Sequence, residues 1–203
     1  DGIESPETGV AIVLPPDRRY VYTAAPLAFY LGAELVPGHE ARIETESLSV
    51  SLGEGRAFED AVARSLKQVL FLDAVVRTEG LYQLDLYERR QVEADLPFDV
   101  AATYGRPPAE RLSAYLDVEY GSISEYLPTW VLTAHLPAAP ESAEAIPFVL
   151  NDLGVIRKPR GTRHEHPGAV IEDYSPLNDS SPVQRSNPSS VIRSPESASA
   201  AQS

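Results

Sequence analysis

The stretch AFEDAVARSLKQVLFLDAVVRTEG, residues 57–80, decides the fold that we predict. Its first half carries apolar residues at the spacing of one helix face: Phe58, Val62, Leu66 and Val69. Its second half is apolar almost all round, which a helix tolerates only when other elements cover most of it. Gly80 is placed to end the helix in a left-handed conformation. We therefore expect a helix of about 35 Å, at ~1.5 Å per residue, with the chain organised around it.

The residues before this helix predict a βαβ unit. Residues 9–14 form a continuous apolar run that ends at two prolines, as in a strand buried on both faces. Residues 26–31 predict a helix with Pro26 in its first turn and Gly32 just past its end. Residues 33–36 then fit a returning strand, so the unit is expected to be parallel and right-handed.

The next strand and the middle of the chain are also indicated by local patterns. Residues 47–52 alternate strictly and predict an edge strand with one wet face. Asp85 and Glu88 have the spacing of a capping box for a helix over 86–94. Two further short helices are expected, one capped by Asp99 and one opened by Pro108.

The last part of the pattern returns to strand, helix and strand, over 129–136, 141–150 and 154–157. The predicted fold class is therefore α/β: a small, mainly parallel sheet built from two βαβ-like halves with a helical block between them. We divide the chain into a flexible lead-in (1–8), a single domain (9–173, with 57–127 mainly helical) and a Ser/Pro-rich tail (174–203). The tail is expected to be disordered because it has too little apolar surface to offset its ordering entropy.

Composition excludes some classes of function. The chain has no cysteine, which removes disulfides, thiolate catalysis and cysteine metal sites. Its net charge of −13 argues against nucleic-acid binding, although Arg157, Arg160 and Arg163 form a local basic cluster. The apolar runs are too short for a membrane span, and no secretory signal is visible, so we expect a cytoplasmic protein.

The acidic charge accompanies an unusual choice of cations, because Lys67 and Lys158 are the two lysines beside fifteen arginines. Carboxylates stay hydrated in concentrated salt, and their mutual repulsion is screened there, with a Debye length of about 3 Å at 1 M. We interpret this composition as halophilic. An ordinary acidic protein from a GC-rich genome is the alternative.

Several motifs have both a chemical and a structural interpretation. Gly53 and Gly55 precede the central helix, but the glycine fingerprint of a dinucleotide site is incomplete, so we favour a structural turn. His164 and His166 are the candidate metal ligands, suited to zinc or nickel, but their polar flanks favour a solvated loop. We therefore predict no cofactor.

No catalytic constellation is evident. The nucleophile elbow of serine hydrolases is absent, and thirty acidic residues make any carboxylate pair uninformative. Asp73 is the notable carboxylate because it lies in the apolar half of the central helix. Its ordinary explanation is an ion pair with Arg77, one turn later on the same face.

The phrases RRYVYTAAPLAFYLGAELVPG (18–38), FEDAVARSLKQVLFLDAVVRTEGLYQLDLYERR (58–90) and IPFVLNDLGVIRKP (146–159) resemble a region of uncharacterised haloarchaeal proteins. In longer members this region precedes a CHAT domain, a caspase-like fold. The resemblance implies an accessory module joined to an effector domain. It implies no peptidase activity here, because that chemistry needs a His–Cys dyad and this chain has no cysteine.

Two functions remain in competition. The first is a non-catalytic interaction or sensor module that acts beside an effector domain, in the same chain or in a partner. The second is a ligand-binding or enzymatic domain with its site at the carboxyl ends of the parallel strands, near Pro15–Arg19 and Pro37–His39. An enzyme would show a deep pocket with converging polar groups there, and a module a broader surface. A purely structural halophilic protein is a third possibility.

Overall fold

A computed structural model describes residues 7–80, 84–129, 132–159 and 170–172. The predictions for His164, His166 and the tail from residue 174 concern residues outside these ranges. The elements are, in chain order, β1 (Ala11–Leu14), α1 (Arg18–Leu31), β2 (Glu34–Pro37), β3 (Arg42–Glu44), β4 (Ser49–Ser51), α2 (Gly55–Arg77), α3 (Tyr87–Val92), η1 (Glu93–Asp95), α4 (Val100–Tyr104), α5 (Pro108–Leu116), α6 (Tyr120–Ile123), β5 (Thr133–His135), η2 (Pro140–Ala145), α7 (Ile146–Asn151), β6 (Val155–Arg157) and β7 (Val170–Glu172).

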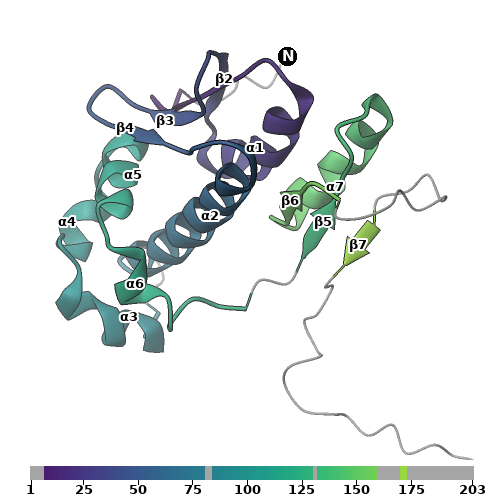
Figure 1. Cartoon of the computed structure of the whole chain (residues 1–203). Helices are drawn as coiled ribbons and strands as arrows, with labels where there is room; N and C mark the ends of the chain where they lie inside the picture. The colour runs from purple at the N-terminus through teal and green to yellow at the C-terminus, as the bar shows by residue number, and fades with distance from the viewer. Residues whose placement is uncertain (1–6, 81–83, 130–131, 160–169, 173–203) are drawn as a thin grey trace, which may run out of the picture.

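The described strands form two mixed sheets, so the α/β class is confirmed but the mainly parallel sheet is wrong. In the first sheet, of order β2-β1-β3-β4, only the β1–β2 pair is parallel. In the second, of order β6-β5-β7, β6 is parallel and β7 antiparallel to β5. The two βαβ connections are therefore present, and antiparallel neighbours extend each of them. Figure 1 shows the first sheet above α2 and the second beyond α1.

The antiparallel part of the first sheet is a hairpin of β3 and β4, of which the sequence patterns predicted β4 but not β3. β3 alternates buried Ile43 with half-buried neighbours, and the backbone of Thr45 turns the chain by donating to the carbonyl of Leu48 at 2.8 Å. The hydroxyl of Thr45 accepts from the amide of Leu48 at 3.1 Å, which stabilises this turn. So short a connection permits only antiparallel pairing. β4 is an edge strand with Ser49 and Ser51 exposed, as expected.

The helix α2 lies at the centre of the molecule, as expected (Figure 1). Its predicted stripe is fully buried, with Phe58, Val62, Leu66 and Val69 all at most 3% exposed. The expected left-handed stop at Gly80 is wrong, because α2 ends at Thr78 in a right-handed conformation. The hydroxyl of Thr78 donates to the carbonyl of Val75 at 2.6 Å, so a side chain satisfies this helix end.

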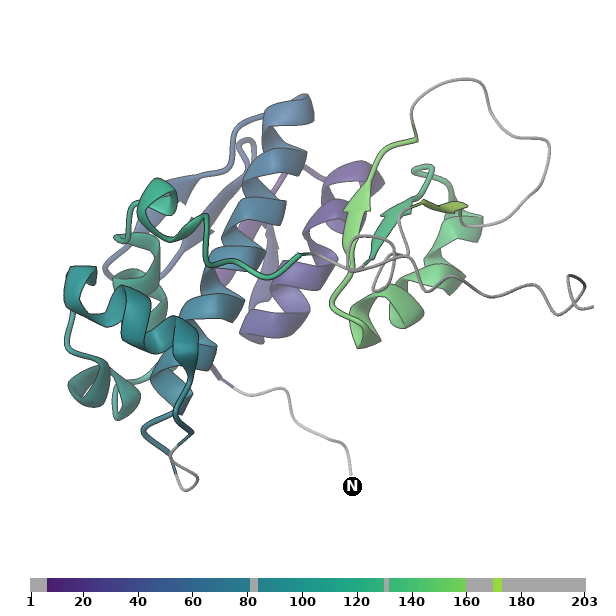
Figure 2. The ribbon, with the colours of Figure 1, turned by 90° about the horizontal axis from the view of Figure 1, so that it is seen from below.

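The helix α1 is longer than expected. It begins after Asp17, whose carboxylate accepts from the backbone amide of Arg19 at 2.8 Å, and Pro26 lies inside it rather than in its first turn. Gly32 ends the helix in the left-handed conformation, as expected. The longer α1 contributes to two cores: Leu27 packs in the main core, and Tyr22 packs in the second, C-terminal core. Figure 2 shows α1 beside α2 on one flank and the C-terminal unit on the other.

The helical block between the sheets follows its predicted outline with one correction. The carboxylate of Asp99 caps α4 and Pro108 opens α5, as expected. The capping box of Asp85 and Glu88 is wrong, because α3 begins after Leu86 with no side-chain cap. Its position is fixed instead by Arg89, whose guanidinium donates to Thr78 at 2.7 Å and forms ion pairs with Glu79 and Glu93.

The C-terminal unit packs its own small core against α1. The strand expected over 129–136 is shorter, and the helix expected over 141–150 is split into η2 and α7. Pro147 causes no break because it occupies the first turn of α7, where its missing amide costs nothing. Arg157 of β6 joins this unit to α2 by donating to Asp60 at 2.7 Å.

Candidate functional site

A cluster of polar side chains surrounds Asp73, whose own side chain is only 8% exposed. Four groups contact its carboxylate, two at each oxygen. Oδ2 accepts a hydrogen bond from the Tyr30 hydroxyl at 2.8 Å and forms an ion pair with Nε of Arg77 at 2.7 Å. Oδ1 accepts from the Tyr115 hydroxyl at 3.2 Å and from Nη1 of Arg111 at 3.5 Å. The expected Arg77 partner is confirmed, and three further partners join it.

Three helices supply this Asp73 cluster. Asp73 and Arg77 are one turn apart on α2, and Arg111 and Tyr115 are one turn apart on α5. Both pairs therefore project from single faces of their helices. Tyr30 comes from the last turn of α1. The spacing of Arg111 and Tyr115 was a second sequence signal for this site, beside that of Asp73 and Arg77, but it did not reveal that α5 faces Asp73.

Burial and the Asp73 carboxylate both raise the pKa of Tyr30 above its ordinary value, and burial is the larger cause. The same two causes raise the pKa of Tyr115. Both phenols are therefore hydrogen-bond donors at neutral pH. The cluster contains two guanidinium cations and one carboxylate anion, so its formal charge is +1 in a chain of −13.

A cavity of about 190 Å³ opens beside this cluster. Its wall includes the polar side chains of Tyr30, Asp73, Arg77, Arg111 and Tyr115, together with Thr8. The Nε atom of Arg111 is buried and has no hydrogen-bond partner among the described residues. Such an atom in a native structure calls for an explanation, because buried donors are almost always paired.

A larger groove, of about 790 Å³, runs along the edge strand β4. Leu48 and Val50 form its sheet side, and residues of α5 and of the loops on either side of α4, Phe98 among them, form its helical side. Four charged residues line it, namely Asp99, Arg106, Glu110 and Asp117, for a formal charge of −2. We call this hollow the β4 groove.

The predicted carboxyl-end site lies outside both of these cavities. β1 and β2 are parallel, with Leu14 opposite Pro37, so Pro15–Arg19 and Pro37–His39 do lie side by side. Neither the Asp73 cavity nor the β4 groove contains any of these residues. The turn at Gly38 is instead tightly packed, since a Cβ there would lie 2.3 Å from the side chain of Val13.

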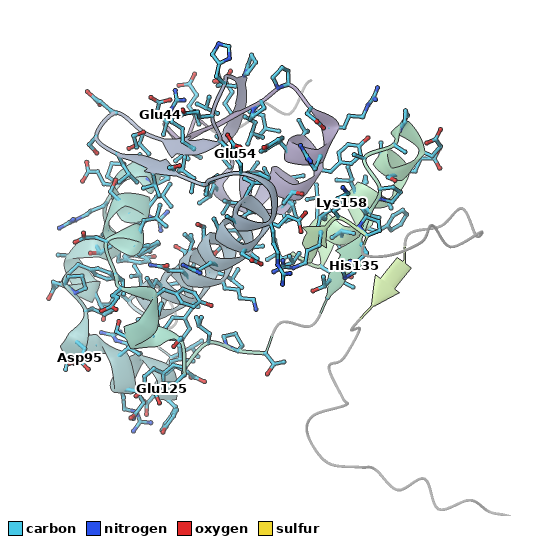
Figure 3. The ribbon with its side chains drawn as sticks, viewed as in Figure 1. Glu44, Glu54, Asp95, Glu125, His135 and Lys158 are labelled. Carbon is cyan, nitrogen blue, oxygen red and sulfur yellow. The ribbon has the colours of Figure 1, made fainter. Side chains whose placement is uncertain are left out.

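The other polar or glycine positions considered as sites either have a structural contact or lie outside the described residues. Gly53 and Gly55 both adopt positive φ angles, 70° and 56°, as a structural turn into α2 requires. His135 lies on β5 beside Lys158, as Figure 3 shows, with Nδ1 3.4 Å from the Lys158 carbonyl. Within the part of the chain that the structure describes, no three His, Asp or Glu side chains gather as a metal site would require.

Comparisons with known proteins give no match to a family model, to a curated protein or to a solved structure. Across residues 7–80, 84–129, 132–159 and 170–172, none of the helices has the length and apolar character needed to cross a bilayer.

Proposed function

We propose that the protein is a non-catalytic interaction module whose β4 groove binds an extended, basic segment of a partner protein. The observation that carries this proposal is the position of the groove along an edge strand. Among the strands that the structure describes, β4 pairs with β3 alone, so its other edge presents backbone groups that no described strand pairs. An extended peptide can add to such an edge through main-chain hydrogen bonds, with side-chain pockets providing specificity.

The lining of the groove indicates the chemistry of the segment. Leu48, Val50 and Phe98 offer apolar contacts, and Glu110 and Asp117 offer exposed carboxylates. A segment that alternates apolar residues with Lys or Arg complements both features. The groove lies at the sheet edge rather than at the carboxyl ends of β1 and β2, which favours this module over the enzyme considered above.

The resemblance to the region that precedes a CHAT domain suggests which kind of partner is involved. Under this proposal the bound segment belongs to an effector domain, in the same polypeptide or in an associated chain. We also propose that the protein is halophilic and cytoplasmic, and its acidic surface supports the halophilic part of this proposal. In Figure 3 the labelled carboxylates Asp95 and Glu125 lie at the lower edge of the fold, where solvent ions reach them.

Selection of displayed peptides on the whole 203-residue chain tests the proposal. We expect selected sequences to alternate apolar and basic residues. We also expect the double variant Glu110→Arg with Asp117→Arg to bind them at least ~10-fold more weakly, since it reverses the charge of the groove. The matched control is Glu141→Arg, an exposed acidic position on η2 of the C-terminal unit.

Amide exchange would locate the bound peptide. Protection of the backbone amides of β4 on binding would support addition to the sheet edge. Failure to select any peptide, or selected peptides that bind the groove variant and the Glu141→Arg control equally, would overturn the proposal.

A further inference from the structure

The Asp73 cavity has features that the interaction module does not use. It lies between α1, α2 and α5, whereas the β4 groove lies at the sheet edge, and Leu112 and Tyr115 line only the former. Every formal charge on its wall comes from Asp73, Arg77 and Arg111. The balance of these charges is positive, in contrast to the protein as a whole.

The carboxylate of Asp73 already has partners within the cluster at both of its oxygens. Each of its oxygens accepts from one tyrosine hydroxyl and contacts one guanidinium, so a further group entering the cavity meets a carboxylate whose two oxygens both have partners. The role of Asp73 is then to position the two guanidiniums. This arrangement resembles the outer-shell carboxylates that orient ligand-binding side chains at other sites.

Both guanidiniums have N–H groups that donate to no partner among the described residues. Arg77 pairs with Asp73 through Nε, and its side chain, which lines the cavity, is 66% exposed. Arg111 makes one contact, from Nη1 at 3.5 Å, and its buried Nε has no partner among the described residues. A guanidinium presents five N–H groups in a fork that matches two oxygen atoms of a carboxylate or phosphate.

The volume of the Asp73 cavity limits the size of the ligand that it can hold. A cavity of about 190 Å³ is smaller than the ~300–1,000 Å³ of sites for drug-sized ligands. It is several times the ~30 Å³ that one water molecule occupies in the liquid. Inorganic phosphate and short dicarboxylates fall within this range.

We infer that the Asp73 cavity is a binding site for a small oxyanion, held by the guanidiniums of Arg77 and Arg111. Phosphate and a short dicarboxylate such as succinate share this chemistry. Because the ligand would contact residues of three helices, binding also stabilises the packing of α1, α2 and α5. Ligands that bind only the folded state raise its stability by RT ln(1 + [L]/Kd).

The test is a calorimetric titration of the whole chain with phosphate, sulfate and succinate at constant ionic strength set by KCl. We expect saturable binding of at least one anion, with a rise in Tm that follows the same saturation. Phosphate and sulfate binding without succinate would assign a tetrahedral anion, and succinate alone a dicarboxylate; each outcome supports the site.

Variants separate this site from a general salt effect. Arg77→Gln removes the exposed guanidinium and is expected to weaken binding at least ~10-fold, as is normal for the loss of a charged hydrogen-bond donor. The matched control is Arg56→Gln on the same helix, where the guanidinium is 71% exposed and lies outside the cavity. Arg111→Lys keeps the charge next to Asp73 but loses the fork, so weaker binding with an unchanged fold is expected.

No saturable binding of any of the three anions would overturn the inference. An equal response of the Arg77→Gln and Arg56→Gln proteins would also overturn it. Either result would leave the proposal for the β4 groove unaffected, because Arg77 and Arg56 do not line that groove.

Discussion

The hydroxyl of Tyr30 on α1 donates a hydrogen bond of 2.8 Å to Oδ2 of Asp73 on α2. This bond links two helices through residues 43 positions apart in the chain. It is also the only contact of the cluster that comes from α1, since the other three donors belong to α2 and α5. The stability of the helical core and the geometry of the cavity therefore depend on the same carboxylate.

Asp73→Asn is expected to destabilise the protein by about 3 kcal/mol. The change leaves Arg111 partly buried without its counter-ion, and breaking one partner of a buried pair is costly. Urea unfolding followed by circular dichroism measures the loss. The matched control, Asp85→Asn, lies in an exposed pair with Arg90 and is expected to remain near wild type. Equal stability of the two variants would show that the Asp73 cluster contributes nothing to the fold.

The tyrosines of the cluster predict a loss of stability at alkaline pH. The folded-state pKa values of Tyr30 and Tyr115 are raised above the ordinary value of 10.0, so the folded protein holds these protons more tightly than the unfolded chain. Their contribution is complete below pH 10 and is lost progressively as the pH rises above it. We expect the double variant Tyr30→Phe with Tyr115→Phe to show a flatter decline between about pH 10 and 12. Parallel curves for the variant and wild type would contradict this assignment.

Gln68 holds the end of α5 against α2. Its side-chain amide donates to the carbonyls of Tyr115 at 2.7 Å and Val118 at 2.8 Å, and all three residues are buried. Gln68→Leu leaves both carbonyls without this donor and is expected to cost about 2 kcal/mol in the free energy of unfolding. The exposed Gln91→Leu on α3 serves as the control in the same urea experiment. Amide exchange in α5 should quicken only in the Gln68 variant.

Gly38→Ala tests the close packing of the turn that follows β2. The added Cβ would lie 2.3 Å from Cγ1 of Val13, so we expect a loss of about 1–3 kcal/mol as the strand β1 is displaced. At Gly105 a Cβ meets nothing within 4 Å and φ is −82°, so Gly105→Ala is expected to be neutral or slightly stabilising. Thermal unfolding of the two variants gives the comparison. A Gly38→Ala protein as stable as Gly105→Ala would be inconsistent with this packing.

The charge of −13 predicts that stability increases with salt. Thermal unfolding of the wild-type protein in KCl, from near zero to about 3 M, measures this dependence, since screening removes the repulsion among the carboxylates. A large rise in Tm supports the halophilic interpretation. Full stability at low salt would remove the compositional support for the resemblance to haloarchaeal proteins.

The sequence by itself determined the features that depend on neighbours along the chain. The buried stripe of α2, the glycine at the end of α1, the cap at Asp99 and the proline at the start of α5 were all predictable. Each of these signals lies within one or two helical turns, where periodicity and side-chain caps act. The ion pair of Asp73 with Arg77 belongs to the same group, because its partners are four residues apart on one helix.

Only the tertiary structure decided which elements meet. Pairing of β1 with β3 made the first sheet mixed, and β7 extended the second, because strand order depends on contacts between distant segments. The turn at Thr45 and the alternation around Ile43 were visible in the sequence, but three residues give too short a pattern to identify a strand. In the same way, nothing local indicates that Tyr30 and Arg111 face Asp73. The carboxylate needs these donors because it is buried, and its burial is itself a result of the packing of α1 and α5 against α2.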